Sequence, residues 1–244
     1  MYNLAGAAPQ VINCRFIQNS AGLGGGGMAN LESAPEVRGS TFVQNSSPQQ
    51  GGGVLNNLSP GATFVACQFT QNDAFIFGGG MYNVSSAVTV DRSWFIRNGE
   101  TEFGAGIANE NSDIVLRNSL VVQNVSLVHG GALYNKNSSP LILGSTIADN
   151  FAPFRGAGMF LTENSRPTVN NSIFWNNFNE EIGATDTSGF SASYSNIRNV
   201  NPSDNVLSTD PLFFDGFNLN YRLDTGSPMI DAGQNALIDG EELL

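Results

Sequence analysis

The sequence has few charged residues and very few basic ones. Only 13% of its 244 residues are charged, lysine occurs once, at Lys136, and the formal net charge is −11. The arginines are scattered singly, so no basic patch is available to contact phosphate groups. We therefore expect neither a nucleic acid nor an anionic membrane surface as a partner.

Long apolar runs are also missing. No stretch approaches the roughly 20 apolar residues that cross a bilayer, so no transmembrane segment is expected in this chain. The first residues lack the basic region followed by an apolar one that marks a signal peptide. A chain of 244 residues that is 41% hydrophobic can nevertheless bury one sizeable core. These features indicate a single folded domain.

A repeat of 26 or 27 residues runs through most of the chain. FxxN-like motifs begin at Phe16, Phe42, Phe69, Phe95, Val121, Ile147 and Phe174. A glycine-rich motif in the same phase ends at Met28, Val54, Met81, Ile107, Leu133 and Met159. Two motifs that keep one spacing over six repeats indicate an architecture of stacked units.

Within each repeat the apolar residues alternate, which is the period of a β-strand. Three short strands cannot bury their apolar faces alone, so each repeat must stack on the next. The expected fold is all-β, a right-handed parallel β-helix with three short strands and about 26 residues per coil. A propeller blade needs about 40 residues, and a sandwich would not repeat one motif in phase. We place the coils at residues 1–177, and terminal coils with a capping segment of the same domain at residues 178–244.

The repeat also places identical residues above one another. The asparagines that follow the glycine-rich motif, such as Asn30 and Asn56, should form amide ladders at corners that tolerate positive φ. Cys14 and Cys67 share an inward column with serines, two coils apart. A separation of ~9 to 10 Å exceeds the roughly 7 Å limit for a disulfide, so both should be free thiols in the core.

The paired FxxN and GGA[ILV] motifs resemble the repeats of chlamydial polymorphic outer-membrane proteins and of other bacterial β-helix surface proteins. The segments YSNI (residues 194–197), DPLFFD (210–215) and YRLDTGSPMIDAG (221–233) look like the ending that many such β-helices share. The resemblance implies a secreted or surface-displayed protein, often adhesive, in which this ending closes the last coils. The chlamydial type continues into a membrane barrel, which we do not expect within these 244 residues.

A search for catalytic groups assigns none. Glycoside hydrolysis needs two carboxylates about 5 to 9.5 Å apart, and few acids occupy matching repeat positions. Asp91 has only Arg92 and Arg117 near it, while Glu100, Glu102 and Glu110 belong to turns of one coil. No carboxylate cluster has the spacing of a calcium site, so we expect no metal and no cofactor.

Aromatic and loop residues form a candidate partner-binding face. One part is an outward column beside the third strand, with Tyr82, Tyr134 and Phe160. The other is the variable loop before the glycine motif, with Phe77, Phe103, His129 and Arg155. Repeat proteins concentrate variation on the face that binds. The alternative is that these residues only cover the core.

The sequence thus favours a structural or adhesive β-helix module, extracellular or at the cell surface and non-catalytic. Its expected partners are a polysaccharide or another surface protein, with stacking on an adjacent module at the N-terminal end. The alternative is a polysaccharide-active enzyme, a lyase or a glycoside hydrolase, that uses a lateral face of the β-helix. A cleft with converging acids and a basic residue would favour the enzyme.

Overall fold

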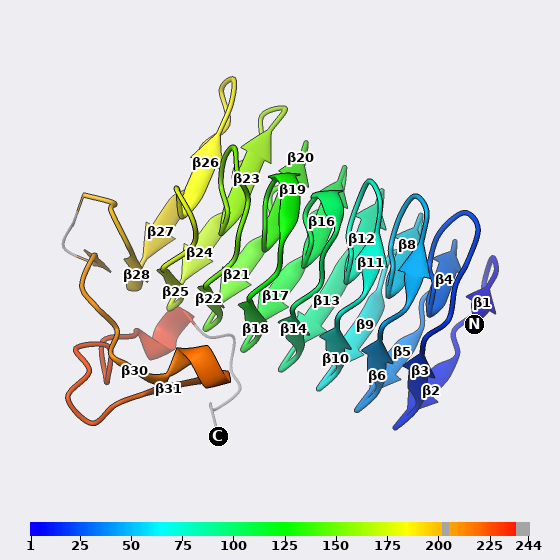
Figure 1. Ribbon diagram of the computed structural model, residues 1–244, viewed down its shortest axis with the longest axis horizontal. Coiled ribbons are helices and arrows are strands. Elements are labelled where there is room, and N and C mark those ends of the chain that lie inside the picture. The colour runs from blue at the N-terminus through cyan, green and yellow to red at the C-terminus, as the bar shows by residue number, and fades with distance from the viewer. Residues whose placement is uncertain (202–204, 238–244) are drawn as a thin grey trace.

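The computed structural model describes residues 1–201 and 205–237 and shows a β-solenoid whose coils follow one another along a single axis (Figure 1). Three parallel sheets run along the rod, and each coil contributes one strand to each sheet. The expected parallel β-helix with three strands per coil is therefore confirmed.

The sheets are named A, B and C in the order in which the chain enters them. Sheet A contains β1 (Tyr2–Asn3), β4 (Met28–Leu31), β8 (Val54–Asn57), β12 (Met81–Val84), β16 (Ile107–Glu110), β20 (Leu133–Lys136), β23 (Met159–Thr162) and β26 (Ile182–Ala184). Sheet B contains β2 (Gln10–Ile12), β5 (Glu36–Arg38), β9 (Ala62–Val65), β13 (Val88–Asp91), β17 (Val115–Arg117), β21 (Leu141–Leu143), β24 (Thr168–Asn170) and β27 (Ser191–Ser193). Sheet C contains β3 (Arg15–Ile17), β6 (Thr41–Val43), β10 (Gln68–Thr70), β14 (Trp94–Ile96), β18 (Leu120–Val122), β22 (Thr146–Ala148), β25 (Ile173–Trp175), β28 (Ser195–Ile197) and β29 (Val206–Leu207).

Three small pairs complete the strands. They are β7 (Ser46–Ser47) with β11 (Asp73–Ala74), β15 (Thr101–Phe103) with β19 (Ser126–His129), and the antiparallel hairpin of β30 (Phe213–Asp215) and β31 (Asn220–Leu223). Two short 3₁₀ turns, η1 (Gly216–Asn218) and η2 (Asn235–Leu237), lie in the C-terminal segment.

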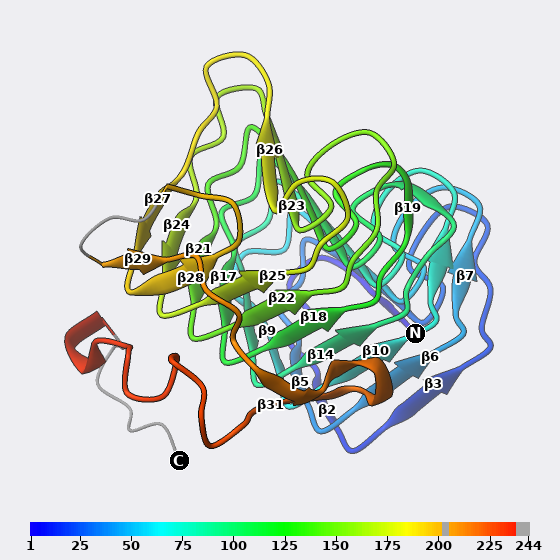
Figure 2. The same ribbon diagram turned by 60° about the vertical axis from the view of Figure 1, so that its left-hand side comes forward.

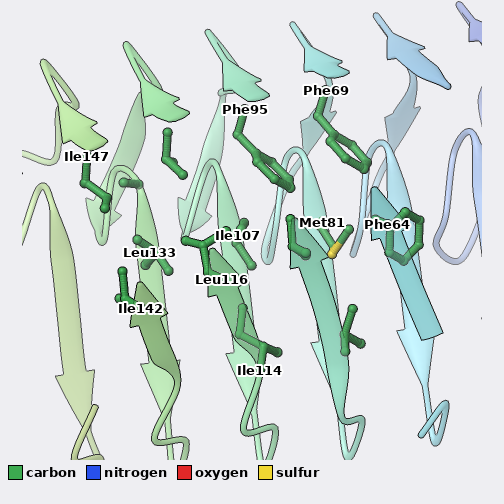
Figure 3. Packing of buried hydrophobic residues seen from close by; sticks show 14 of the residues in the cluster. Phe64, Phe69, Met81, Phe95, Ile107, Ile114, Leu116, Leu133, Ile142 and Ile147 are labelled. Carbon is green, nitrogen blue, oxygen red and sulfur yellow. The ribbon is translucent and has the colours of Figure 1, made fainter. Parts of the chain in front are cut away.

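The register of the strands follows the repeat. Phe69 of β10 pairs with Phe42 on one side and Phe95 on the other, and Met81 of β12 lies between Val54 and Ile107. Aligned phenylalanines stack inside the rod with ring centroids 4.4 to 4.8 Å apart. Figure 3 shows Phe69 and Phe95 pointing inward towards the residues of sheet A. Because each coil covers the apolar face of the next, one continuous core fills the solenoid.

The asparagines after the glycine-rich motif form the expected ladder, in which Asn30 Nδ2 donates to Asn56 Oδ1 at 2.8 Å. The FxxN asparagines form a second ladder, and neither set takes the positive φ. The residue before each FxxN asparagine does, as at Gln44 and Gln71, both with φ of 53°. The asparagine itself points inward and is buried, and Asn45 Nδ2 donates to Asn72 Oδ1 at 2.9 Å. The polar column is therefore selected by its hydrogen bonds across coils and not by backbone conformation.

The cysteines lie in the expected register and both are free thiols. Their backbone N–H groups both donate to a serine hydroxyl one coil on, Cys14 to Ser40 and Cys67 to Ser93, each at 3.0 Å. Cys67 is buried, but Cys14 is exposed, so the expectation of two core thiols is wrong for Cys14. The reason is that Cys14 belongs to the first coil, over which no other described coil lies.

The C-terminal segment, expected to cap the last coils, does so only in part. Strands β26 to β29 continue the three sheets, and Val200 and Val206 pack against the end of the core. The hairpin β30–β31 instead lies beside the solenoid, along sheet C (Figure 2). The segment that resembles a shared β-helix ending therefore covers a side of the rod as well as its end.

Candidate binding surfaces

The aromatic column expected on the outer face of sheet A is buried. Tyr82, Tyr134 and Phe160 on the outer face of sheet A are only 3%, 8% and 4% exposed, and Ala108 between the tyrosines is fully buried. They form a second apolar cluster, separate from the core of the solenoid, that also contains Leu55. The expectation that these three rings stand on an open face is wrong.

The variable loop is what covers them. Phe77, Phe103, His129 and Arg155 are bridged from coil to coil like residues of a parallel strand, which makes the loop a regular ridge over sheet A. The rings of the loop pack against the rings of sheet A. The centroids of Phe77 and Tyr82 are 5.2 Å apart, and those of Phe103 and Tyr134 are 5.0 Å apart. The two groups of expected site residues thus do meet, but they pack against one another.

The histidine at the end of this ridge is part of the same stack. The His129 ring lies parallel to the Phe160 ring at 4.2 Å, and burial lowers the pKa of the imidazole. Arg155 beside it pairs with Glu180 at 3.0 Å. All four loop residues keep part of their surface in contact with solvent. A partner could therefore touch the ridge, while the buried rings of sheet A are out of its reach.

A polar cluster next to the ridge brings acids and a base together. Lys136 Nζ lies 2.8 Å from Glu110 Oε1 and 3.7 Å from Glu163 Oε1, and Tyr82 Oη donates to Glu110 Oε2 at 2.7 Å. Burial opposes the charge on Glu110, but the hydrogen bonds from Lys136 and Tyr82 outweigh it and lower its pKa. The hydrogen bond to Glu110 in turn raises the pKa of Lys136. The pair is held ionised, which does not suit a general acid of glycoside hydrolysis.

Two further acids lie apart from this cluster: Asp91, which the sequence analysis weighed, and Asp73, which it did not single out. Asp91 is buried and paired with Arg92 at 3.1 Å and Arg117 at 3.5 Å. Burial, together with the charge of Glu100, raises the pKa of Asp73 to about 6. Across residues 1–201 and 205–237, no group of three or more His, Cys, Asp or Glu side chains is placed to hold a metal ion.

One pair of exposed aromatic residues lies at the corner that follows sheet C. Phe151 and Phe178 are 37% and 47% exposed, and their rings are in contact, tilted by 35° with centroids 4.6 Å apart. Val125, 43% exposed, pairs with Phe151 one coil earlier. The sequence contained the signal, because each of these residues directly follows the last asparagine of an FxxN-like motif. Earlier coils carry Ser20 and Ser46 at this position, so the column becomes apolar only near the C-terminal end.

A hollow of about 440 Å³ opens beside this aromatic pair. Its lining adds Asp149, Asn176 and Arg198 to the two rings. Arg198 Nη1 donates to Asn176 Oδ1 at 3.1 Å, and Asp149 Oδ2 accepts from Tyr221 Oη at 2.6 Å. Exposed aromatic rings next to hydrogen-bonding groups that are already oriented form the kind of surface on which a sugar ring can rest.

A larger groove, of about 710 Å³, runs between sheet C and the C-terminal segment. Its sides are joined by two hydrogen bonds: Asn171 Nδ2 donates to the Gln234 carbonyl at 3.0 Å, and Gln234 N donates to Asn171 Oδ1 at 2.8 Å. The groove is thus the gap that remains where the segment lies against the rod, and no motif in the sequence predicted it.

Comparison with known proteins yields one match. Residues 4–147 match a family model described as a right-handed β-helix region, which covers more than half of the chain. No curated protein and no solved structure matches the sequence. In the part of the chain that the structure describes, there is no helix of the length and apolar character needed to cross a membrane.

Proposed function

The chain belongs to the right-handed β-helix family, and from this premise we propose that it is an extracellular structural module that binds neutral glycans weakly along its side. The fold supplies the structural part, a rigid rod on which surface residues recur at each coil. Display outside the cell is supported by the resemblance of its repeats to those of bacterial surface proteins.

The observation that carries the binding proposal is the exposed pair Phe151 and Phe178 beside the polar hollow. Burying an aromatic ring against a partner yields a large contact area at a small entropic cost. Arg198 and Asn176 are held in place by their own hydrogen bond, so they are oriented before a ligand arrives. Val125, Phe151 and Phe178 form a strip over three successive coils, which would let one polysaccharide chain place more than one sugar unit on the protein.

The charge of the protein restricts the class of glycan. A net charge of −11 repels polyanions such as uronic-acid polymers, and Arg198, the only basic residue of the hollow, is paired with Glu181 at 2.7 Å. Neutral polysaccharides pay no such electrostatic cost. We therefore expect the preference to be for neutral glycans with exposed apolar ring faces.

The test compares the binding of immobilised neutral and acidic polysaccharides by the wild-type chain and by the double variant Phe151→Ser with Phe178→Ser. Loss of two rings that stack on the ligand, each contributing about 0.5 to 1.5 kcal/mol, should weaken binding by about 5- to 150-fold. The matched control is Phe75→Ser with Phe154→Ser, which removes two rings that are 57% and 64% exposed and do not line the hollow. The control should bind like the wild type.

Equal loss of binding in both double variants would reject the Phe151–Phe178 surface. The enzyme alternative has one supporting observation, the convergence of Glu110, Lys136 and Glu163 on one face. Release of reducing ends from a polysaccharide by the wild-type chain, abolished by Lys136→Met, would replace the adhesive proposal with the enzymatic one.

A further inference from the structure

A chain of hydrogen bonds joins the hairpin β30–β31 to the polar side of the hollow beside the exposed aromatic pair. Tyr221 Oη donates to Asp149 Oδ2 at 2.6 Å, and Asn176 Nδ2 donates to the other oxygen, Oδ1, at 2.5 Å. Asn176 Oδ1 in turn accepts from Arg198 Nη1 at 3.1 Å, and Arg198 pairs with the buried Glu181. Both ends of the Asn176 amide are therefore engaged, and the carboxylate of Asp149 is the point at which two donors meet.

Asp149 keeps hydrogen-bonding capacity that none of the described residues uses. An ionised carboxylate offers about four acceptor positions, and the two hydrogen bonds take one position on each oxygen. Its partners are a phenol and an amide, whereas Asp91, Glu110 and Glu181 each pair with a basic side chain. Asp149 also lines the hollow and is partly exposed. It can therefore accept from a ligand, and such charge-assisted hydrogen bonds are roughly twice as strong as neutral ones.

The hairpin holds the Tyr221 hydroxyl on Asp149. Its apolar side packs on the outer face of sheet C, and at its tip the Gly216 carbonyl accepts from Gln123 Nε2 at 3.2 Å. Burial and the hydrogen bond to Asp149 raise the pKa of Tyr221, so its hydroxyl remains a donor at physiological pH. Without that hydroxyl the ring could stay in place, but one oxygen of Asp149 would lose its anchor. Tyr221 is thus placed to act on a ligand through Asp149.

The carboxylate and the exposed rings lie on the two sides of the buried FxxN asparagines. Asp149 and Phe151 flank the buried Asn150, and Asn176 and Phe178 flank the next asparagine of the ladder in the same way. A polar row and an apolar row therefore run side by side along the rod, with one residue of each per coil at a spacing of ~4.8 Å. A sugar ring whose face rests on Phe151 or Phe178 can direct its hydroxyl edge towards the polar row.

We propose that Asp149 determines the specificity of this surface by accepting hydrogen bonds from two adjacent hydroxyl groups of one sugar unit, and that Tyr221 is its positioning residue. This role rests on the proposed glycan binding and narrows the ligand to neutral glycans with an unsubstituted vicinal diol on the edge that faces Asp149. A polymer with methylated hydroxyls keeps its apolar ring faces but has no O–H donor for the carboxylate. It should therefore retain only the contribution of the two aromatic rings.

The test measures the affinity of the full chain, immobilised on a sensor, for galactomannan, xyloglucan and a mixed-linkage β-glucan, each in native and O-methylated form. The variants are Asp149→Asn, which removes the charge with little change of shape, and Tyr221→Phe, which keeps the ring. Asp113→Asn, which removes an exposed charge at the corner between sheets A and B, is the control for the first. Arg222→Gln, which alters the exposed neighbour of Tyr221 on β31, is the control for the second.

For the native polymer that the wild type binds best, Asp149→Asn should weaken binding at least tenfold and Tyr221→Phe about three- to tenfold, whereas both controls should bind like the wild type. The methylated polymer should bind more weakly than the native one, and equally in the wild type and both variants. A residue that only supported the fold would weaken the binding of both forms alike. Limited proteolysis should show that the hairpin of Tyr221→Phe remains docked.

Unchanged affinity of Asp149→Asn and Tyr221→Phe for the native polymer would overturn this role of Asp149. So would equal affinity of the wild type for native and methylated polymers. In either case the glycan proposal stands if Phe151→Ser with Phe178→Ser still loses binding. Both proposals fail if the wild type binds none of the three native polymers, or binds them equally well without the two rings.

Discussion

The outer faces of sheets A and C are both covered, but by different parts of the chain. Over sheet A, the residue that covers Tyr82 is Phe77, five residues earlier in the same coil. Over sheet C, Ile96, Val122 and Ala148 are covered by the hairpin β30–β31, through Phe213, Leu219 and Tyr221. Gln123, at the edge of that patch, contacts Tyr221 across 98 residues of sequence.

The difference shows two ways to shield an apolar sheet face. The cover of sheet A is built by the repeat itself, so it is renewed at each coil and becomes part of the interior. The cover of sheet C is a single hairpin that folds back once and makes its apolar contacts with strands β14, β18 and β22. Removing the first should unfold the solenoid, whereas removing the second should leave most coils intact.

The largest effect is expected from Tyr82→Ser, Phe103→Ser and Tyr134→Ser together. Loss of one buried aromatic side chain costs about 3 to 5 kcal/mol, and the whole protein is stabilised by only about 5 to 15 kcal/mol. The triple variant should therefore be unfolded or strongly destabilised, as measured by thermal and urea denaturation. Phe75→Ser with Phe154→Ser, on the exposed side of the same loops, is the control and should melt close to the wild type. A stable, cooperatively folded triple variant would mean that the loop ridge adds nothing to the core.

A smaller effect is expected from Leu219→Ser with Tyr221→Ser in the hairpin. The change removes the apolar contact with sheet C and the Tyr221–Asp149 hydrogen bond, which is worth about 1 to 3 kcal/mol because one partner is charged. Limited proteolysis should cut the hairpin while the coils stay resistant, and the newly exposed sheet should bind an apolar dye. Phe217→Ser, at a tip that is 86% exposed, should change neither result. Loss of protease resistance throughout the rod would contradict the division into an essential and an accessory cover.

The smallest effect concerns Asp73, which lies in the loop that leads into the cover of sheet A. Its pKa is raised to about 6 by burial and by Glu100. The folded protein therefore binds this proton more tightly than the unfolded chain, whose Asp pKa is about 3.9. The resulting stability is present below about pH 4 and is lost as the pH rises through 6.

Asp73→Asn should accordingly melt like the wild type near pH 4 and at a higher temperature than the wild type near pH 8. Glu32→Gln, at an exposed corner, is the control and should show no such pH-dependent difference. A constant offset between Asp73→Asn and the wild type from pH 4 to pH 8 would mean that Asp73 titrates normally.

The fold could be predicted because the motifs that specify it recur at a fixed spacing along the chain. The phase of the FxxN and glycine motifs predicts which residues lie above one another, and Phe16, Phe42, Phe69 and Phe95 do so. The candidate binding face could not be predicted in the same way. Alternation distinguishes the two faces of a strand, so it placed Tyr82 and Tyr134 outside sheet A correctly, but it contains no information on whether another segment covers them.

The sequence by itself determined the coil, its register, the ladders and the free thiols, because each depends on contacts between residues 26 or 27 positions apart that recur many times. Tertiary structure alone decided which outward residues meet solvent. The loops close over Tyr82 and Phe160, the hairpin returns to sheet C, and Glu181 ends one asparagine ladder by accepting from Asn177. These contacts occur once, or depend on the path of a loop, and a periodic pattern cannot specify an interaction that is not repeated.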